Sequence, residues 1–196
     1  MTIPQDSRTC IDLHCHSTAS DGALSPEALI ARAVEQGVSH LALTDHDTIA
    51  GLEVARGAAS GSGLSLINGV ELSCVWRSHT IHVVGLDFDE RDPTFLTSLE
   101  RQNENRWQRA RMIADRLSRL NVDQLLERAT KVAGGDVPGR PHFAEVLVED
   151  GVVPKVAHAF KRYLGTGKPG DVKACWPDLP EVVQWIVAAG GIAVLA

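Results

Sequence analysis

The sequence has no apolar run that approaches the roughly 20 residues needed to cross a lipid bilayer, so a membrane protein is not expected. The opening segment, Met1 to Thr9, is polar and contains Pro4, and it therefore lacks the apolar core of a secretory signal. Excess positive charge is also missing. The formal net charge of −6 argues against a generic nucleic-acid coat, although it leaves room for a local basic site.

Cysteine is scarce, with four residues among 196, and the four show neither Cys-x-x-Cys spacing nor a dense framework. We therefore expect reduced thiols in a cytoplasmic protein. The chain length, the hydrophobic content of 44% and the charged content of 22% are ordinary for a globular domain with one buried core and a modest insertion. The cysteines are Cys10, Cys15, Cys74 and Cys175.

A His-x-His pair near the N-terminus is the strongest chemical feature of the sequence. The apolar segment from Cys10 to His16 is typical of a short strand, in which alternate side chains point to opposite faces. His14 and His16 would then share one face, with the carboxylate of Asp21 five residues further on. Such groups can converge on divalent metal ions, and the alternative explanation is that they are polar residues near a strand end.

Strands and helices alternate in the first half of the sequence. Ser25, Pro26 and Glu27 are typical of a helix N-terminus, and Gly37 is typical of its end. This alternation predicts a parallel α/β core, either an open sheet or a barrel. The expected strands are residues 10–16, 40–44, 64–75 and 80–86, and a second helix is expected at 48–59.

The pattern changes at Asp92 and Pro93, which begin a long helix with an apolar stripe. We predict an α/β domain formed by residues 1–91 and 167–196, with residues 92–166 as a small helical insertion. Further helical segments are expected at 123–133, 141–150, 155–164 and 179–189, followed by a strand at 192–196.

Residues that commonly bind metals recur where the predicted strands end. His46 follows the second strand, Glu71 lies on the third and His82 lies on the fourth. In parallel α/β folds the carboxyl ends of the strands share one rim, where active sites form. A lone His82 would more simply be a hydrogen-bonded core histidine, but in company with the other positions it favours metal ligation.

The types of ligand narrow the choice of ion. Imidazole and carboxylate without a convergent cysteine fit zinc, manganese or iron(II) better than copper(I) or an iron–sulfur cluster. Glu71 has two oxygens and could bridge neighbouring ions. Bridged ions about 3.5–4 Å apart clamp phosphate oxygens during in-line displacement, which points toward hydrolysis of phosphate esters. Asp45 and Asp47 flank His46 and are expected to orient its ring.

The ordered motifs are Asp12-x-His14-x-His16-Ser17, Ser20-Asp21-Gly22, Thr44-Asp45-His46-Asp47, Gly69-Val70-Glu71 and His82-x-x-Gly85. Together they resemble the PHP (polymerase and histidinol phosphatase) family over residues 10–87. The resemblance implies a distorted (β/α)7 barrel with a trinuclear metal site. Carried over by motif, His14, His16 and Glu71 would hold the first metal. Glu71 and His82 would share the second metal, and Asp21 and His46 would bind the third.

Two later segments indicate which branch of the PHP family the sequence resembles. Gly139-Arg140-Pro141-His142-Phe143 and Leu164-Gly165-Thr166-Gly167-Lys168 are similar to one branch of the family. That branch contains bacterial nucleoside 3′,5′-bisphosphate phosphatases and enzymes that degrade short RNA from the 5′ end. Arg140 and His142 stand at a helix start, which favours anions, so phosphate contact is expected there. Lys168, in a glycine-rich loop, either contacts phosphate or belongs to a flexible turn.

Arginines are concentrated in the long helix, and two explanations for them stay open. They form a solvated face with helical charge pairs, or some of them grip substrate phosphate. The four tryptophans are expected in the core, although one could stack on a base. The arginines are Arg101, Arg106, Arg109, Arg111, Arg116 and Arg119, and the tryptophans are Trp76, Trp107, Trp176 and Trp185.

The family pattern continues after the strand that matches Ile192 to Ala196 with a His-Pro pair and an Asp-x-His motif, whereas this chain ends at Ala196. We expect a barrel whose C-terminal part is absent, because an isolated domain would not normally end on a bare apolar strand. Residues 1–196 alone are expected to hold fewer ions and hold them weakly, with little phosphatase activity and poor solubility.

The function predicted from the sequence is hydrolysis of phosphate esters with up to three divalent ions (Mn²⁺, Zn²⁺ or Fe²⁺). Glu71, Arg140 and His142 are the candidate catalytic residues, and Arg140, His142 and Lys168 are the candidate substrate contacts. The expected substrate is the 3′-phosphate of a nucleoside 3′,5′-bisphosphate, or a short 5′-phosphorylated oligoribonucleotide. The alternatives from the same chemistry are another phosphomonoester, such as histidinol phosphate, and an exonuclease attached to a replication system. The alternative of another class is a non-catalytic metal-stabilised module that binds nucleotides or a partner protein.

Overall fold

The computed structural model describes residues 10–173 and 175–196, so the polar N-terminal segment, which lacks the apolar core of a secretory signal, lies outside the described residues. The chain forms two compact units. The first comprises the residues up to Cys74 together with Ile81–Leu96 and Leu179–Ala196, and the second comprises Val75–Thr80 and Thr97–Asp178. The domain boundaries expected from the sequence stay a prediction.

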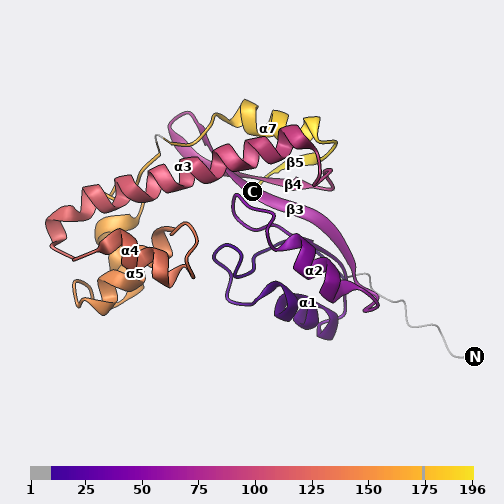
Figure 1. Ribbon diagram of the computed structural model, residues 1–196, viewed down its shortest axis with the longest axis horizontal. Helices are drawn as coiled ribbons and strands as arrows, with labels where there is room; N and C mark the ends of the chain where they lie inside the picture. Colours follow the sequence, from indigo (N-terminus) through magenta and orange to yellow (C-terminus); the bar gives the residue numbers. More distant parts are fainter. Residues whose placement is uncertain (1–9, 174) are drawn as a thin grey trace, which may run out of the picture. The chain divides into compact units, whose positions relative to one another are not determined.

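A five-stranded sheet provides the framework of the first unit (Figure 1). β1 pairs in parallel with β2, and β2 pairs in parallel with β3, whereas β4 and β5 pair antiparallel. The α/β class predicted from the sequence is confirmed. In their order across the sheet, the strands are β1 (Cys10–Cys15), β2 (Val38–Leu43), β3 (Ser65–Trp76), β4 (His79–Leu86) and β5 (Ile192–Leu195).

The expectation of a parallel core is wrong for the last two strands. β3 continues into β4 through only two residues, Arg77 and Ser78. So short a connection joins neighbouring strands in antiparallel fashion, because a parallel pair needs a crossover of about a dozen residues or more. His82 therefore lies in the first half of β4 instead of at the end of a parallel strand.

Two helices of the first unit, α1 (Pro26–Glu35) and α2 (Leu52–Ala59), pack against each other and lie side by side in Figure 1. The Ser25 hydroxyl caps α1 as its sequence predicts, accepting a hydrogen bond from Ala28 N at 3.3 Å. α2 is shorter than the expected helix at 48–59. The first unit also contains α7 (Leu179–Ala188) and the beginning of α3 (Pro93–Leu117).

Helices form most of the second unit, and their apolar faces meet in one core. The long helix α3 contributes Ala110, Ile113 and Leu117 to this core, and α5 contributes Phe143. The segment expected as one helix over 155–164 is a short helix followed by a π-helical turn. The elements are α3 (Pro93–Leu117), η1 (Ser118–Leu120), α4 (Leu125–Val132), α5 (Arg140–Glu149), α6 (Val156–Ala159) and η2 (Phe160–Leu164).

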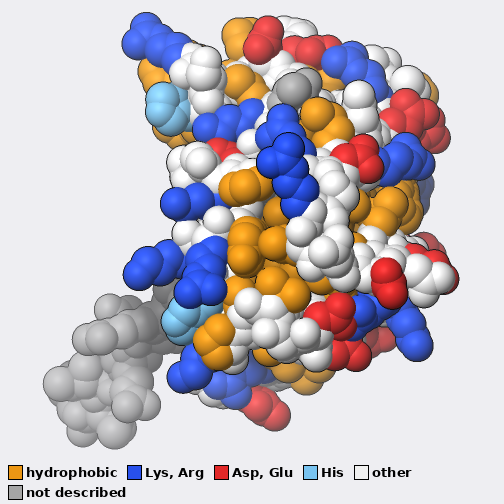
Figure 2. All heavy atoms as spheres, turned by 90° about the vertical axis from the view of Figure 1, so that its left-hand side faces the viewer, with side chains coloured by type: hydrophobic (Ala, Val, Ile, Leu, Met, Phe, Trp, Pro, Cys, Tyr) orange, Lys and Arg blue, Asp and Glu red, His pale blue; other side chains and the backbone are white. Residues whose placement is uncertain are grey.

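The surface is mixed in character. Figure 2 shows a face on which apolar side chains are exposed between charged side chains of both signs. Within the described residues, no helix is both long enough and apolar enough to span a membrane. All four cysteines are free, with Cys74 and Cys175 buried and Cys10 exposed.

Gly69 brings β3 close to the end of β2. A Cβ atom at this position would lie 2.5 Å from the carbonyl oxygen of Leu43 and 2.7 Å from Thr44 Cγ2. Carbon atoms in good contact stay about 3.5–4.0 Å apart, so only glycine permits this approach. The position of Glu71, two residues further along β3, depends on the same contact.

Gly69→Ala should lower the free energy of unfolding by about 1–3 kcal/mol, because β2 and β3 must separate to admit the methyl group. Gly57→Ala is the matched control, since Gly57 lies in α2 with nothing within 4 Å of an added Cβ. This control should raise the free energy of unfolding by up to about 1 kcal/mol. Urea denaturation measures both changes. A Gly69→Ala protein as stable as the wild type would mean that the strands adapt without strain.

Candidate metal centre

Hydrogen bonds continue the parallel pairing of β1, β2 and β3 past the regular strands. Thr44 donates to the carbonyl of Cys15 twice, from its amide at 2.9 Å and from its hydroxyl at 3.0 Å. Glu71 N donates to Asp45 O at 3.1 Å, and Asp47 N donates to Glu71 O at 2.8 Å. These bonds bring the histidines that follow β1 and β2 to the edge where Glu71 lies.

The carboxylate of Glu71 is the centre of the site, and the residue is only 3% exposed. His14 Nε2 lies 2.9 Å from Glu71 Oε2, and His16 Nε2 lies 3.0 Å from the same oxygen. His82 Nδ1 lies 2.8 Å from Oε1, and His46 Nδ1 lies 3.5 Å from Oε2. Four imidazoles therefore surround one buried carboxylate.

Asp21 extends this cluster beside His16 and His46. Asp21 Oδ1 lies 3.9 Å from His16 Nδ1, and Asp21 Oδ2 lies 3.8 Å from His46 Nε2. The rings of His16 and His46 stack, with their centroids 4.6 Å apart. The structure thus brings together all six residues that the sequence analysis names as metal ligands.

Three overlapping groups of residues in the cluster have potential ligand atoms within 4.8 Å of one another. Each pair of groups shares one residue, namely His16, His46 or Glu71. The family pattern shares only Glu71 between sites, so His16 and His46 are more central than expected. Their assignment as ligands stays a prediction. The groups are His14 with His16 and Glu71, His46 with Glu71 and His82, and His16 with Asp21 and His46.

The histidines stabilise the negative charge of Glu71. Burial acts to raise the pKa of Glu71. Hydrogen bonds from His16, His82 and His14, together with the charge of His46, outweigh burial and hold that pKa far below its ordinary value. The hydrogen bond with Glu71 in turn raises the pKa of His16, whereas burial lowers the pKa of His46. Glu71 is therefore an anion at neutral pH.

The donor set suits a divalent cation. Burial, followed by the charges of Asp12 and Asp45, raises the pKa of the Cys15 thiol to about 12, so this neighbouring cysteine is a neutral thiol. The donors are then imidazole nitrogens and carboxylate oxygens, which fit zinc, manganese or iron(II). His16 Nδ1 is buried and has no hydrogen-bond partner within residues 10–173 and 175–196. A cation would supply that nitrogen with the partner it lacks, so the residues fit bound metal ions.

Comparison with known families decides where the chain belongs. The PHP domain family matches residues 12–170, which is most of the chain. The chain belongs to the PHP family. The resemblance drawn from the ordered motifs of the sequence is thereby confirmed.

Curated relatives of this PHP domain align with most of the chain. A 5′-3′ exoribonuclease of Haemophilus influenzae is 49% identical over 185 residues, covering 94% of this chain and 67% of the relative. A 3′,5′-nucleoside bisphosphate phosphatase of Chromobacterium violaceum is 42% identical over 187 residues, covering 95% of this chain and 66% of the relative. The chain thus spans about two thirds of the length of these relatives.

Solved structures show the same fold. An amidohydrolase of Chromobacterium violaceum, with bound sulfate and no metal, has a TM-score of 0.84 at 41% identity, covering 94% of this chain and 66% of that chain. A Bifidobacterium adolescentis protein described as a metal-dependent phosphoesterase has a TM-score of 0.82 at 28% identity, covering 96% of this chain and 66% of that chain. The curled α/β arrangement of this chain is therefore that of PHP-like phosphoesterases.

Asp45 of the PHP domain fixes the loop that carries Asp21. Its carboxylate accepts hydrogen bonds from Ser17 N, Ser17 Oγ and Ser20 Oγ, each at 2.7 Å. The sequence analysis expected Asp45 only as a partner of His46 and missed this contribution. Both serines belong to the first PHP motifs, so the sequence did contain residues that could have indicated this role of Asp45.

Asp47 fixes β3 in the same way. Its carboxylate accepts hydrogen bonds from Ser73 N at 2.6 Å and from Ser73 Oγ at 3.0 Å. Asp47 has a φ of 56°, in the left-handed region that a non-glycine residue rarely adopts. The strained backbone places the carboxylate against β3, two residues beyond Glu71. No pattern in the sequence pointed to Ser73.

The expected phosphate contacts Arg140 and His142 lie at the start of α5, in the second unit. Arg140 Nη1 donates to Leu164 O at 3.2 Å, and its guanidinium lies 6.0 Å from the centre of the Phe160 ring. His142 Nδ1 accepts a hydrogen bond from Gly139 N at 3.0 Å, which caps the helix. Their contact with substrate stays a prediction.

Two arginines of α3 bind main-chain carbonyls, which is a role that the sequence analysis did not consider. Arg109 Nε donates to Val172 O at 3.0 Å, and Arg116 Nη1 donates to Asp171 O at 3.3 Å. These bonds fasten the loop that follows η2 to the long helix. Lys168, the third expected substrate contact, lies exposed in that loop.

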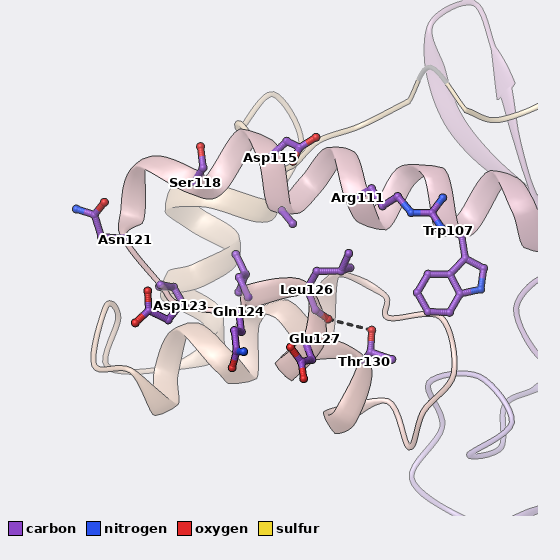
Figure 3. A pocket seen from close by; sticks show the side chains of 13 residues that line it. Trp107, Arg111, Asp115, Ser118, Asn121, Asp123, Gln124, Leu126, Glu127 and Thr130 are labelled. Atoms are coloured by element: carbon purple, nitrogen blue, oxygen red, sulfur yellow. Dashed lines mark hydrogen bonds between the residues drawn. The ribbon is translucent and has the colours of Figure 1, made fainter.

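The tryptophans do not all occupy the core positions that the sequence suggested. Trp76 is 48% exposed, so the expectation of a core position is wrong for this residue. Trp107, Trp176 and Trp185 are partly buried. Trp107 lines a groove of about 890 Å³ between α3 and the following α4 segment (Figure 3).

Glu71→Gln should remove more bound metal than Asp21→Asn, because Glu71 belongs to two of the three groups and Asp21 belongs to one. Both changes keep the shape of the side chain and remove its charge. Elemental analysis of the purified variants gives the metal content, and circular dichroism serves as the control for folding. Equal losses, or a milder loss at Glu71, would contradict the central place of this carboxylate.

Proposed function

We propose that this protein hydrolyses phosphate esters with divalent metal ions bound around Glu71. The observation that carries the proposal is the cluster in which four imidazoles and the carboxylate of Asp21 surround one buried, ionised carboxylate. Such a concentration of metal-type donors at the strand ends of an α/β fold is typical of a hydrolytic metal centre. The exoribonuclease and the bisphosphate phosphatase among the relatives both bear names for cleavage of phosphate esters.

In this proposal the site binds up to three divalent ions, with Mn²⁺, Zn²⁺ and Fe²⁺ as candidates. When bound, such ions polarise phosphoryl oxygens and make a water molecule more acidic. Glu71 would hold two ions because its two oxygens face different histidines, Oε2 toward His14 and His16 and Oε1 toward His82. Asp21 would complete the third position with His16 and His46.

The substrate-binding part of the proposal uses the start of α5. The first amides of a helix lack partners inside it, so a helix N-terminus favours an anion. Arg140 presents a guanidinium there, which can grip a phosphate through two parallel hydrogen bonds. Because His142 Nδ1 accepts from Gly139 N, a neutral ring carries its proton on Nε2 and can donate from that atom. Lys168 adds positive charge in the exposed loop.

We take the substrate to be a nucleoside 3′,5′-bisphosphate that loses its 3′-phosphate, with short 5′-phosphorylated RNA as a further substrate. This choice rests on relatives that are 42% and 49% identical to the chain and are named for these two activities. A cytoplasmic location belongs to the same proposal. Histidinol phosphate and a non-catalytic metal module are the alternatives that an experiment must separate.

The deciding experiment combines metal analysis with product release from a panel of substrates, measured as inorganic phosphate from the phosphomonoesters and as nucleoside monophosphate from the oligonucleotide. The panel contains adenosine 3′,5′-bisphosphate, a 5′-phosphorylated oligoadenylate and histidinol phosphate. We expect bound divalent metal, release from the bisphosphate and no release from histidinol phosphate. Faster turnover of histidinol phosphate would change the substrate class. Bound metal without hydrolysis of any compound would support the non-catalytic module.

Arg140→Ala should raise KM for the bisphosphate about ten-fold while leaving the metal content unchanged, because arginine binds the phosphate and not the ion. Arg162→Ala, which removes an exposed positive charge from η2, is the matched control. Steady-state kinetics and elemental analysis of both variants give the comparison. Metal loss in the Arg140 variant, or an equal rise in KM for both variants, would mean that Arg140 has only a structural role.

A further inference from the structure

The turn between β3 and β4 is built from residues that such a turn disfavours. Arg77 has a φ of 47° and Ser78 has a φ of 67°, so both central residues of this two-residue hairpin are left-handed. Asn-Gly and similar pairs are preferred in such turns. For other residues the left-handed conformation brings Cβ too close to the following carbonyl oxygen and is strained. The hairpin therefore keeps Arg77 at a cost in stability, which suggests a use for its side chain.

The same turn displays an aromatic ring beside a cation. Trp76, the last residue of β3, is 48% exposed, and the Arg77 guanidinium carbon lies 4.5 Å from the centre of its ring. His79 Nδ1 donates to Arg77 O at 2.9 Å, and Val75 N donates to Pro177 O at 2.9 Å, so the turn is held on both strands. Residues 75–80 contain no carboxylate. We call the pair of side chains Trp76 and Arg77 the hairpin platform.

Trp176 beside Arg109 and Trp107 beside Arg111 are further such pairs, and both of these rings are less exposed than Trp76. Trp107 and Arg111 line the groove shown in Figure 3, but Asp115, Asp123 and Glu127 line it as well. Three carboxylates against one guanidinium repel a phosphate backbone. The hairpin platform offers a stacking surface and a guanidinium, with Asp178, which pairs with Val75, as one neighbouring carboxylate against the three in the groove.

We propose that the hairpin platform stacks an unpaired base of a single-stranded oligoribonucleotide. An exposed aromatic ring stacks any base, and a neighbouring arginine adds a cation–π contact and attraction to phosphate. The proposal rests on the proposed function, since it names a contact for the short RNA that the proposed function takes as a further substrate. Stacking of one base on such a side chain contributes enough that its removal weakens binding about ten-fold.

The platform and Glu71 lie at different positions along β3. Trp76 follows Glu71 by five residues, which corresponds to about 17 Å along the strand. Because five is an odd number, the two side chains leave opposite faces of β3. The base that stacks on Trp76 is therefore not the one next to the reacting phosphate. It belongs to a nucleotide further along the strand.

The first test measures binding without hydrolysis. Fluorescence anisotropy of a labelled 5′-phosphorylated oligoadenylate in excess EDTA should show about ten-fold weaker binding for Trp76→Ala, with most of the affinity retained in Trp76→Phe. Val187→Ala, which trims another exposed apolar residue, is the matched control and should leave binding unchanged. Equal affinity of wild type and Trp76→Ala would overturn the proposal, whether or not the protein hydrolyses any phosphate ester.

The second test sets stability against binding. Arg77→Asn combined with Ser78→Gly installs the preferred turn residues, so the melting temperature should rise while oligonucleotide affinity falls. In hydrolysis assays, the ratio of kcat/KM for the oligoadenylate to kcat/KM for the bisphosphate should fall in this variant. A more stable protein with unchanged oligonucleotide affinity would show that the turn serves folding alone. If no substrate is hydrolysed but affinity still depends on Trp76, only the proposed function fails.

Discussion

The rest of the site depends on one buried negative charge, the carboxylate of Glu71. An isolated carboxylate at 3% exposure would be strongly destabilising, and imidazoles contributed by β1, β4 and the segment after β2 compensate for it. The compensation works only while these elements keep their register. Each histidine is therefore both a potential metal ligand and a part of the electrostatic balance that keeps Glu71 buried and ionised.

The fold keeps these elements in register through close backbone approaches and through hydrogen bonds to buried carboxylates. Gly22 allows its loop to return to His16, since a Cβ there would lie 2.3 Å from the His16 carbonyl oxygen. Asp45 fixes the same loop, and Asp47 fixes β3 beyond Glu71. The glycines and acids of the PHP motifs thus include residues that set the distances between ligands without joining the cluster. The packing of the strand ends therefore determines the geometry in which the site can act.

Local rules explain what the sequence could predict. Strand alternation placed His14 and His16 on one face, and the Ser25 cap located the start of α1. Features that depend on contacts between distant segments could not be predicted from the sequence. The antiparallel β4 follows from a two-residue turn at Arg77 that no favoured turn residue marks. The carbonyl partners of Arg109 and the exposure of Trp76 depend on contacts between segments far apart in the sequence, which periodicity does not encode.

The central claim is that Glu71 is the shared anchor of a multi-ion centre. The most direct measurement is a crystal structure of the protein soaked in Mn²⁺, with anomalous-difference density recorded at the manganese edge. The account predicts peaks within coordination distance of both Glu71 oxygens, on the sides that face His14 and His82. Density elsewhere, with the hydrogen bonds between the histidines and Glu71 still intact, would contradict it and leave the cluster as a buried ion-pair network.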